Sequence, residues 1–157
     1  MGDQSCGNLH GTAIEVDGRA ALIRGPSGAG KSDLALRVLA LAPGDFIGGR
    51  PVLVADDRVN AEVSGGKVVV TCPKPLEGLL EVRGIGLIRQ PFTRSATLAL
   101  VVDLVAPEAV ERMPEPGRSV MVCGCRVAAM ALAPFEASAP LKLMLALAGQ
   151  GVSSGHD

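Results

Sequence analysis

One short segment constrains the fold of this chain more than any other. It fits the pattern G-x-x-x-x-G-K-[ST] and lies between an apolar run at residues 20–23 and a second apolar segment at residues 34–39. The pattern consists of Gly25, Pro26, Ser27, Gly28, Ala29, Gly30, Lys31 and Ser32. A phosphate-binding loop requires a strand before such a pattern and a helix after it. The sequence therefore predicts a strand, a phosphate loop and a helix, in that order.

The residue types in the loop explain how it would hold phosphate. Glycines adopt positive φ and have no Cβ, so backbone N–H groups can turn towards an anion. The helix that follows adds unpaired N–H groups and the positive end of its dipole. In such sites the lysine contacts the β- and γ-phosphates and the next hydroxyl binds Mg²⁺. The pattern thus gives these roles to Lys31 and Ser32 and predicts a nucleoside triphosphate with Mg²⁺.

The composition indicates one globular domain, expected over residues 1–150, with a disordered tail at residues 151–157. The chain has 157 residues, a net charge of -1, three Phe and no Trp or Tyr. Few aromatic side chains and no basic run argue against a nucleic-acid partner. The chain has neither an apolar stretch of membrane-spanning length nor the features of a signal peptide, so we expect a cytoplasmic protein without a membrane partner.

The remaining elements predict an α/β fold with a mixed, largely antiparallel sheet. Hairpin signals flank the loop on both sides, which fits a mixed sheet better than a regular β-α-β succession. The apolar run at residues 51–55 is typical of a strand buried on both faces. The expected strands lie at residues 9–16, 19–24, 51–55, 61–63, 67–71, 95–105, 120–123 and 126–132. A helix is expected from about residue 31 to before residue 43, one helical turn or more at residues 107–112, and a C-terminal helix at residues 137–148.

The chain has four cysteines, namely Cys6, Cys72, Cys123 and Cys125. A C-x-C pair with two distant partners does not match the usual spacing of a zinc site. We therefore expect all four to be reduced, small and mostly buried. Cys123 and Cys125 fall on a predicted strand, which would place their side chains on one face.

Three further signals accompany the phosphate loop. His10 lies fifteen positions before Gly25, Asp56-Asp57 follows the strand at residues 51–55, and Glu81-Val82-Arg83-Gly84-Ile85-Gly86 comes next. With the loop, these residues resemble the HPr kinase/phosphorylase family, which combines an upstream His, a phosphate loop, an A-D-D strand end and the signature E-[IV]-R-G-[LI]-G. The resemblance runs from about residue 9 to about residue 104.

The resemblance implies a fold like that of phosphoenolpyruvate carboxykinase, with flanking helices, and an ATP-dependent kinase. Its substrate would be a serine of HPr, the small phosphocarrier of the sugar phosphotransferase system. In the reverse reaction, inorganic phosphate attacks the phosphoserine and pyrophosphate is released. The family usually forms a hexamer, so a homo-oligomer is implied.

The resemblance also implies a role for each matching residue. Asp56 would be the catalytic acid/base, and His10 would bias the charge of the carboxylates. Asp57 would hold metal or orient Asp56. Glu81 would complete the Mg²⁺ site with Ser32, since this cation prefers oxygen ligands. Arg83 would stabilise the transferred phosphate; alternatively, it is a surface arginine paired with Glu81.

This sequence departs from the family pattern in two places. The N-terminal domain of many members does not precede the matching region, which suggests a short form. The region at residues 106–119 is also shorter than the mobile loop in which the family carries a phosphate-binding arginine. Arg112 and Arg118 are both candidates for that role. These departures leave the reverse reaction open.

Two other functions are compatible with a phosphate loop. A small-molecule kinase or ATPase would need an arginine-bearing lid, which the chain after Glu81 does not supply. A nucleotide-sensing module without chemistry would be favoured by loss of the lysine or the carboxylates. Lys31, Ser32, Asp56 and Glu81 are all present, which favours the kinase.

Overall fold

The computed structural model describes residues 4–44 and 48–149, so the tail expected at residues 151–157 lies outside the described residues. Its helices are α1 (Lys31–Leu39) and α2 (Ala139–Leu147), with 3₁₀ turns η1 (Lys74–Leu76) and η2 (Pro107–Ala109). Its strands are β1 (Gln4–His10), β2 (Thr12–Val16), β3 (Arg19–Arg24), β4 (Val52–Ala55), β5 (Arg58–Ser64), β6 (Lys67–Thr71), β7 (Leu79–Val82), β8 (Gly86–Arg89), β9 (Ser95–Leu104), β10 (Ser119–Val122) and β11 (Cys125–Leu132). The one helical turn or more expected at residues 107–112 is the 3₁₀ turn η2.

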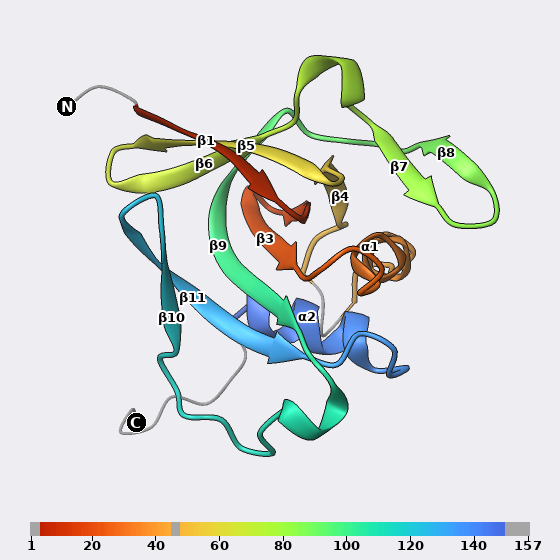
Figure 1. The fold of residues 1–157 in the computed structure, drawn as a ribbon, viewed down its shortest axis with the longest axis vertical. Coiled ribbons are helices and arrows are strands. Elements are labelled where there is room, and N and C mark those ends of the chain that lie inside the picture. Colours follow the sequence, from red (N-terminus) through yellow and green to blue (C-terminus); the bar gives the residue numbers. More distant parts are fainter. Residues whose placement is uncertain (1–3, 45–47, 150–157) are drawn as a thin grey trace.

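The main sheet is mixed, as predicted, and most of its strand pairs are antiparallel (Figure 1). Its main path runs in the order β1-β5-β6-β9-β3-β2-β4, with β10 and β11 joined to β9 as a branch. Strand β9 runs parallel to both β3 and β11. The first residues of β9 pair with β6 and its last residues pair with β11. Strand β9 therefore joins the two parts of the sheet and lies beside the strand that leads into the phosphate loop.

Strand β3 is buried on both faces, which fixes the position of the loop that follows it. Ala20 and Leu22 belong to one buried cluster, whereas Ala21 and Ile23 belong to the other. This alternation follows from the two-residue period of a strand. Buried residues of α1 and α2 pack in the cluster of Ala21 and Ile23, so both helices cover the same face of β3.

The strand expected at residues 9–16 is divided at Gly11. Strand β1 pairs with β5, whereas β2 forms the predicted hairpin with β3. A Cβ at Gly11 would lie 2.6 Å from the carbonyl oxygen of Ile23, so only glycine fits at this break. The Gly11 N–H donates to the carbonyl of Asp57 at 3.2 Å. The break therefore brings His10 and Thr12 next to the end of β4.

Strand β4 is as buried as its apolar sequence predicts, although it ends the main path of the sheet. Leu53 and Val54 are fully buried. Leu53 donates its N–H to the carbonyl of Pro91 at 3.3 Å and accepts from the N–H of Thr93 at 2.9 Å. The segment at residues 91–93 thus covers the outer edge of β4, and the strand delivers Asp56 and Asp57 to one end of the sheet.

Strands β7 and β8 form a separate two-stranded sheet that projects from the body of the molecule (Figure 1). Ile85 and Leu87 on this hairpin are 77% and 68% exposed.

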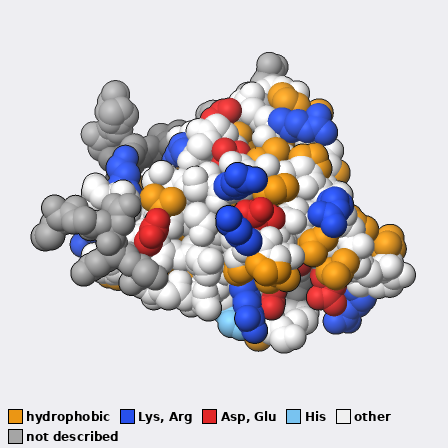
Figure 2. Space-filling model, turned by 90° about the horizontal axis from the view of Figure 1, so that it is seen from above, with side chains coloured by type: hydrophobic (Ala, Val, Ile, Leu, Met, Phe, Trp, Pro, Cys, Tyr) orange, Lys and Arg blue, Asp and Glu red, His pale blue; other side chains and the backbone are white. Residues whose placement is uncertain are grey.

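On the face seen in Figure 2, basic and acidic side chains both occur among apolar ones. No described helix is long and apolar enough to cross a membrane.

Candidate active site

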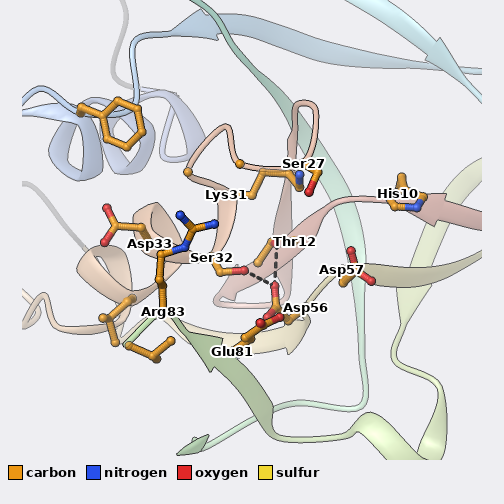
Figure 3. Close-up of a pocket in the computed structure, with 15 residues that line it drawn as sticks. His10, Thr12, Ser27, Lys31, Ser32, Asp33, Asp56, Asp57, Glu81 and Arg83 are labelled. Carbon is orange, nitrogen blue, oxygen red and sulfur yellow. Dashed lines mark hydrogen bonds between the residues drawn. The ribbon is translucent and has the colours of Figure 1, made fainter. Parts of the chain in front are cut away.

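A cavity of about 560 Å³ lies where the phosphate loop, the end of β4 and the end of β7 meet (Figure 3). Most of the residues predicted for the site line it, namely His10, Ser27, Gly28, Gly30, Lys31, Ser32, Asp56, Asp57, Glu81 and Arg83. Gly25, Pro26 and Ala29 belong to the loop but do not line the cavity. Five lining residues were not predicted from the sequence, namely Thr12, Asp33, Leu36, Val82 and Phe135.

The loop presents the open N-terminus of α1 to this cavity. Gly28 and Gly30 have φ values of 84° and 100°, in the left-handed region that favours glycine. Gly30 caps α1 without a side-chain hydrogen bond, and the N–H of Leu34 makes the first helical bond to its carbonyl at 2.9 Å. The N–H groups before Leu34 have no carbonyl partner within the helix. Unpaired N–H groups at the N-terminus of a helix are the groups that bind anions in proteins, and the sequence predicts phosphate binding here.

Lys31 lies over the same loop. Its Nζ donates to the carbonyl of Gly25 at 2.8 Å and to that of Pro26 at 3.1 Å. The ammonium group thus lies beside the first two residues of the loop. A phosphate bound at the N-terminus of α1 would offer it a charged acceptor in place of these two neutral carbonyls.

An ion pair fixes the two parallel strands just before the loop. Nε and an Nη of Arg24 donate to the two carboxylate oxygens of Asp103 at 2.8 and 3.0 Å. These hydrogen bonds, with the charge of Asp103, raise the pKa of Arg24 above its ordinary value although burial opposes the shift. Since Arg24 ends β3 and Asp103 lies near the end of β9, the pair sets the register from which the loop begins.

Asp56 connects three parts of the cavity wall. Its Oδ1 accepts hydrogen bonds from the hydroxyls of Ser32 at 2.7 Å and Thr12 at 2.8 Å. Its Oδ2 accepts from the backbone N–H of Glu81 at 3.0 Å. Thr12 is fully buried, and its only signal in the sequence is a polar residue at the start of an apolar run. Both oxygens of Asp56 are therefore engaged by the protein itself.

Asp57 is more open than Asp56. Its backbone has a φ of 71°, which is unusual for a non-glycine residue, and its side chain is exposed. Figure 3 places Asp57 and His10 on one side of Asp56, and Asp33 and Arg83 on the other. His10 lines the cavity at the end of β1. The cavity thus has an end formed by His10 and Asp57.

The hairpin β7–β8 supplies the lower wall of the cavity in Figure 3. Glu81 lies on β7, and Arg83 lies in the turn after it, which the N–H of Ile85 closes on the carbonyl of Val82 at 3.0 Å. In the described structure Arg83 and Glu81 form no ion pair, so the alternative pairing is not found. The Glu81 N–H to Asp56 bond attaches this hairpin to the end of β4.

The oxygen donors of the cavity are suited to Mg²⁺. Among the described residues, no three His, Cys, Asp or Glu side chains are grouped closely enough to hold a metal ion by themselves. Mg²⁺ is usually bound by one or two carboxylates, with phosphate oxygens and water completing its shell. The hydroxyl of Ser32 and the carboxylates of Asp56 and Glu81 fit that kind of partial site.

The two arginines proposed for the shortened loop lie outside the cavity lining. Arg118 forms an ion pair with Glu111 at 3.2 Å, and neither Arg112 nor Arg118 is among the lining residues. Both are exposed on the segment between η2 and β10. The choice between them stays open.

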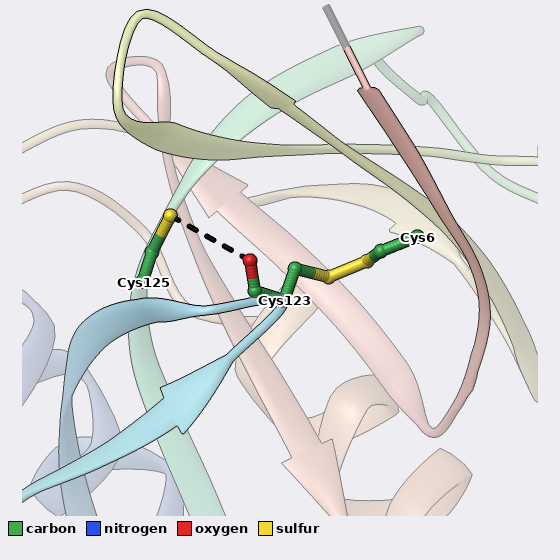
Figure 4. The surroundings of a disulfide bond; sticks show 3 residues. All are labelled: Cys6, Cys123 and Cys125. Carbon is green, nitrogen blue, oxygen red and sulfur yellow. Dashed lines mark hydrogen bonds between the residues drawn. A yellow bond between two sulfur atoms is a disulfide. The ribbon is translucent and has the colours of Figure 1, made fainter.

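The expectation that all four cysteines are reduced is wrong. Cys6 on β1 forms a disulfide with Cys123, whose Cα lies 5.7 Å away (Figure 4). Cys123 is not on a strand but in the turn between β10 and β11, with a φ of 52°, so its side chain can reach β1. Cys72 and Cys125 are free thiols. Burial, with the charges of Glu77 and Asp56, raises the pKa of Cys72 to about 11.

Comparisons with known proteins place the chain in a family. Residues 4–147 match the family model described as HPr Serine kinase C-terminal domain. An HPr kinase/phosphorylase of Acidovorax sp. (strain JS42) is 40% identical over 116 residues, covering 66% of this chain and 33% of that protein. One from Bordetella pertussis is 40% identical over 117 residues, covering 68% of this chain and 35% of that protein. The chain therefore spans about a third of the length of these curated relatives.

A solved structure supports the fold. The Hpr(Ser) kinase/phosphatase from Coxiella burnetii matches with a TM-score of 0.75, covering 91% of this chain and 95% of that chain at 22% sequence identity. Like the family-model match over residues 4–147, this match extends beyond residue 104, the last residue of the region in which the motifs themselves indicate the resemblance. The predicted α/β fold with a mixed sheet and flanking helices is thus confirmed.

Proposed function

Since the chain belongs to the HPr serine kinase C-terminal domain family, we propose that it is a protein serine kinase that transfers the γ-phosphoryl group of ATP to a serine hydroxyl of HPr. The observation that carries this proposal is the contact between Ser32 and Asp56 at 2.7 Å. It joins the phosphate loop, where a donor would bind, to the strand end that carries two carboxylates. A cytoplasmic location, a homo-oligomer and a regulatory role in the phosphotransferase system belong to the same proposal.

The donor side of the site is the phosphate loop. Backbone N–H groups at the N-terminus of α1 would bind the phosphates, and Lys31 would leave the carbonyls of Gly25 and Pro26 to contact them. When bound, Mg²⁺ would neutralise part of the phosphate charge. Ser32, Asp56 and Glu81 are the residues that would hold it.

The hydrogen bonds of Asp56 support a division of roles different from the one expected by resemblance. Both of its oxygens already accept hydrogen bonds, so a serine hydroxyl would have to displace Ser32, Thr12 or the Glu81 N–H. Among the described residues, none donates a hydrogen bond to the exposed carboxylate of Asp57. We therefore assign Asp56 to the metal side and Asp57 to accepting the proton of the serine hydroxyl.

His10 and Arg83 complete the acceptor side in this proposal. His10 lines the same end of the cavity as Asp57, where its charge would influence that carboxylate. Arg83, in the turn after β7, would donate hydrogen bonds to the transferred phosphoryl group. In the reverse reaction, inorganic phosphate would attack the phosphorus of the phosphoserine, so that pyrophosphate forms while the bond to the serine oxygen breaks. The Asp57 carboxyl would give its proton to that oxygen and restore the serine hydroxyl.

The test is incubation of the purified chain with γ-labelled ATP, Mg²⁺ and purified HPr. We expect label on one serine of HPr and none on HPr whose acceptor serine is replaced by alanine. The variant Lys31→Met is the matched control on the kinase side. ATP hydrolysis without labelled HPr would overturn the proposal in favour of a small-molecule kinase or ATPase. Release of pyrophosphate from phosphoseryl-HPr with inorganic phosphate tests the reverse reaction.

A further inference from the structure

Phe135 is an exposed aromatic side chain to which the proposed transfer gives no role. It lies between β11 and α2, lines the cavity, and is 72% exposed. The sequence contains three Phe, and among the Phe residues that the structure describes only Phe135 lines the cavity. Exposed apolar side chains also occur elsewhere on this chain, but Phe135 lines the cavity, so its ring is available to a ligand that enters there.

The ring lies directly against the phosphate loop. A Cβ added at Gly30 would meet Cε1 and Cζ of Phe135 at 2.9 Å. Gly30 is the N-cap of α1, where the phosphates of a nucleotide would bind. The ring therefore lies beside the N-terminus of α1, where the phosphates of ATP would bind in the proposed transfer.

The backbone on both sides of Phe135 is fixed to α1. Arg37 donates to the carbonyls of Pro134 and Glu136, the two neighbours of Phe135. The same guanidinium donates to Asp33 at 3.1 Å. An exposed ring on an anchored backbone is ready to receive a flat ligand without loss of backbone freedom. These contacts also place Phe135 at the Asp33 end of the cavity.

The Asp33 end is the end at which the nucleoside would lie. In the proposed transfer the γ-phosphate must face Asp57, which lies on the opposite side of Asp56 from Asp33 (Figure 3). The chain of phosphates then runs from Asp57 past Ser32, and the ribose and base extend towards Asp33. Leu36 and Val82 are the other apolar side chains with bulk among the lining residues of this cavity.

We propose that Phe135 stacks on the base of the donor nucleotide and that Leu36 and Val82 line the rest of this base site. The inference rests on the proposed function, because it takes a nucleoside triphosphate as the donor. Stacking on one aromatic ring uses the π-face that every base has, so Phe135 would add affinity with little selection among purines. Arg37 would support this stack indirectly, because it holds the backbone on both sides of Phe135.

The first experiment measures binding of Mg-ATP and of magnesium tripolyphosphate, which has no base, by calorimetry. Removal of a base–aromatic stack lowers affinity by about tenfold. We expect Phe135→Ala to lower the affinity for Mg-ATP by that factor and to leave the affinity for magnesium tripolyphosphate within about twofold of wild type. The matched control is Met121→Ala, which removes a side chain that is 62% exposed on β10, away from the cavity lining.

The second experiment uses the absence of Trp and Tyr from the sequence. In Phe135→Trp the new indole is the sole strong fluorophore, and ATP should quench it whereas tripolyphosphate should not. In Met121→Trp neither ligand should change the emission. Equal ATP affinity in wild type and Phe135→Ala would overturn the inference and leave the kinase proposal intact. The inference would also be overturned if Phe135→Ala lowered the affinity for ATP and for tripolyphosphate equally, or if it changed only the phosphorylation of HPr. A wild-type protein that binds neither ATP nor tripolyphosphate would overturn both proposals.

Discussion

The hydroxyl of Ser32 donates a hydrogen bond of 2.7 Å to Oδ1 of Asp56, across 24 residues of sequence. The same oxygen accepts the hydroxyl of Thr12 at 2.8 Å. The first turn of α1, the start of β2 and the end of β4 therefore meet at one carboxylate oxygen. A cation bound by Ser32 would therefore also contact Asp56. This is why we assign Asp56 to the metal and the neighbouring Asp57 to the serine proton.

We predict that Asp57→Asn keeps ATP binding and loses phosphoryl transfer. The loop and the Asp56 contacts are untouched, so affinity for Mg-ATP should stay within about threefold of wild type. Transfer to HPr should fall on the order of 100- to 10,000-fold, because an amide cannot accept the serine proton. Calorimetry measures the first quantity, and labelled phosphate on HPr measures the second.

The contrasting variant is Asp56→Asn. An amide group cannot accept hydrogen bonds on both sides as the carboxylate does, so either the hydroxyl pair or the Glu81 N–H loses its partner. We expect a weaker Mg²⁺ dependence of ATP binding as well as lost transfer. If Asp56→Asn binds Mg-ATP normally and Asp57→Asn transfers normally, the two roles are the reverse of those assigned here.

The sequence predicts the parts of the site that depend on local pattern. A phosphate loop is defined by a short sequence pattern between a strand and a helix. Residues 20–39 contain the end of the strand, the pattern and the helix in one continuous segment. Asp56 and Asp57 follow an apolar run, so their place at a strand end is also local. The sheet could be predicted as mixed because hairpin signals flank the loop.

Features that depend on distant partners could not be predicted in this way. Thr12 acquires its role from Asp56, 44 residues away. Phe135 lies beyond the motifs that the sequence offers, and Arg37 donates to the carbonyls of its two neighbours across 97 and 99 residues of sequence. The disulfide joins residues 117 positions apart, and it requires β1 to pair with β5 rather than extend into the hairpin. Neither the periodicity of apolar residues nor the spacing of the cysteines predicts the pairing of β1 with β5.

We predict that Thr12→Val lowers stability and that Thr12→Ser does not. Valine has nearly the same shape as threonine but removes a buried donor from the charged oxygen of Asp56. Loss of a hydrogen bond to a charged group costs about 1.5–3 kcal/mol. Urea unfolding of the three proteins measures the difference. A loss of similar size in Thr12→Ser would mean that the methyl group, not the hydroxyl, stabilises this position.

The disulfide should stabilise the chain strongly when it is formed. It closes a loop over a sequence separation of 117 residues between β1 and the β10–β11 turn. Loops of that size contribute about 2–5 kcal/mol, mainly by restricting the unfolded chain. We expect Cys6→Ser to lower the free energy of unfolding by that amount under oxidising conditions. The matched control is Cys125→Ser, which removes a free thiol. With dithiothreitol the Cys6→Ser variant and wild type should become equal, and a difference that persists would contradict the disulfide as its cause.

The pKa of Cys72 predicts a pH range in which stability declines. Burial raises this pKa from its ordinary value of 9.0 to about 11, with Glu77 and Asp56 adding negative charge nearby. Between these two values the folded chain keeps a thiol proton that the unfolded chain has released, so the free energy of unfolding falls as pH rises. Cys72→Ala should remove this part of the decline, whereas Cys125→Ser should keep it. Urea unfolding from pH 8 to pH 10.5 measures both slopes. An identical slope in wild type and Cys72→Ala would mean that other groups cause the decline, since the small cavity left by alanine does not depend on pH.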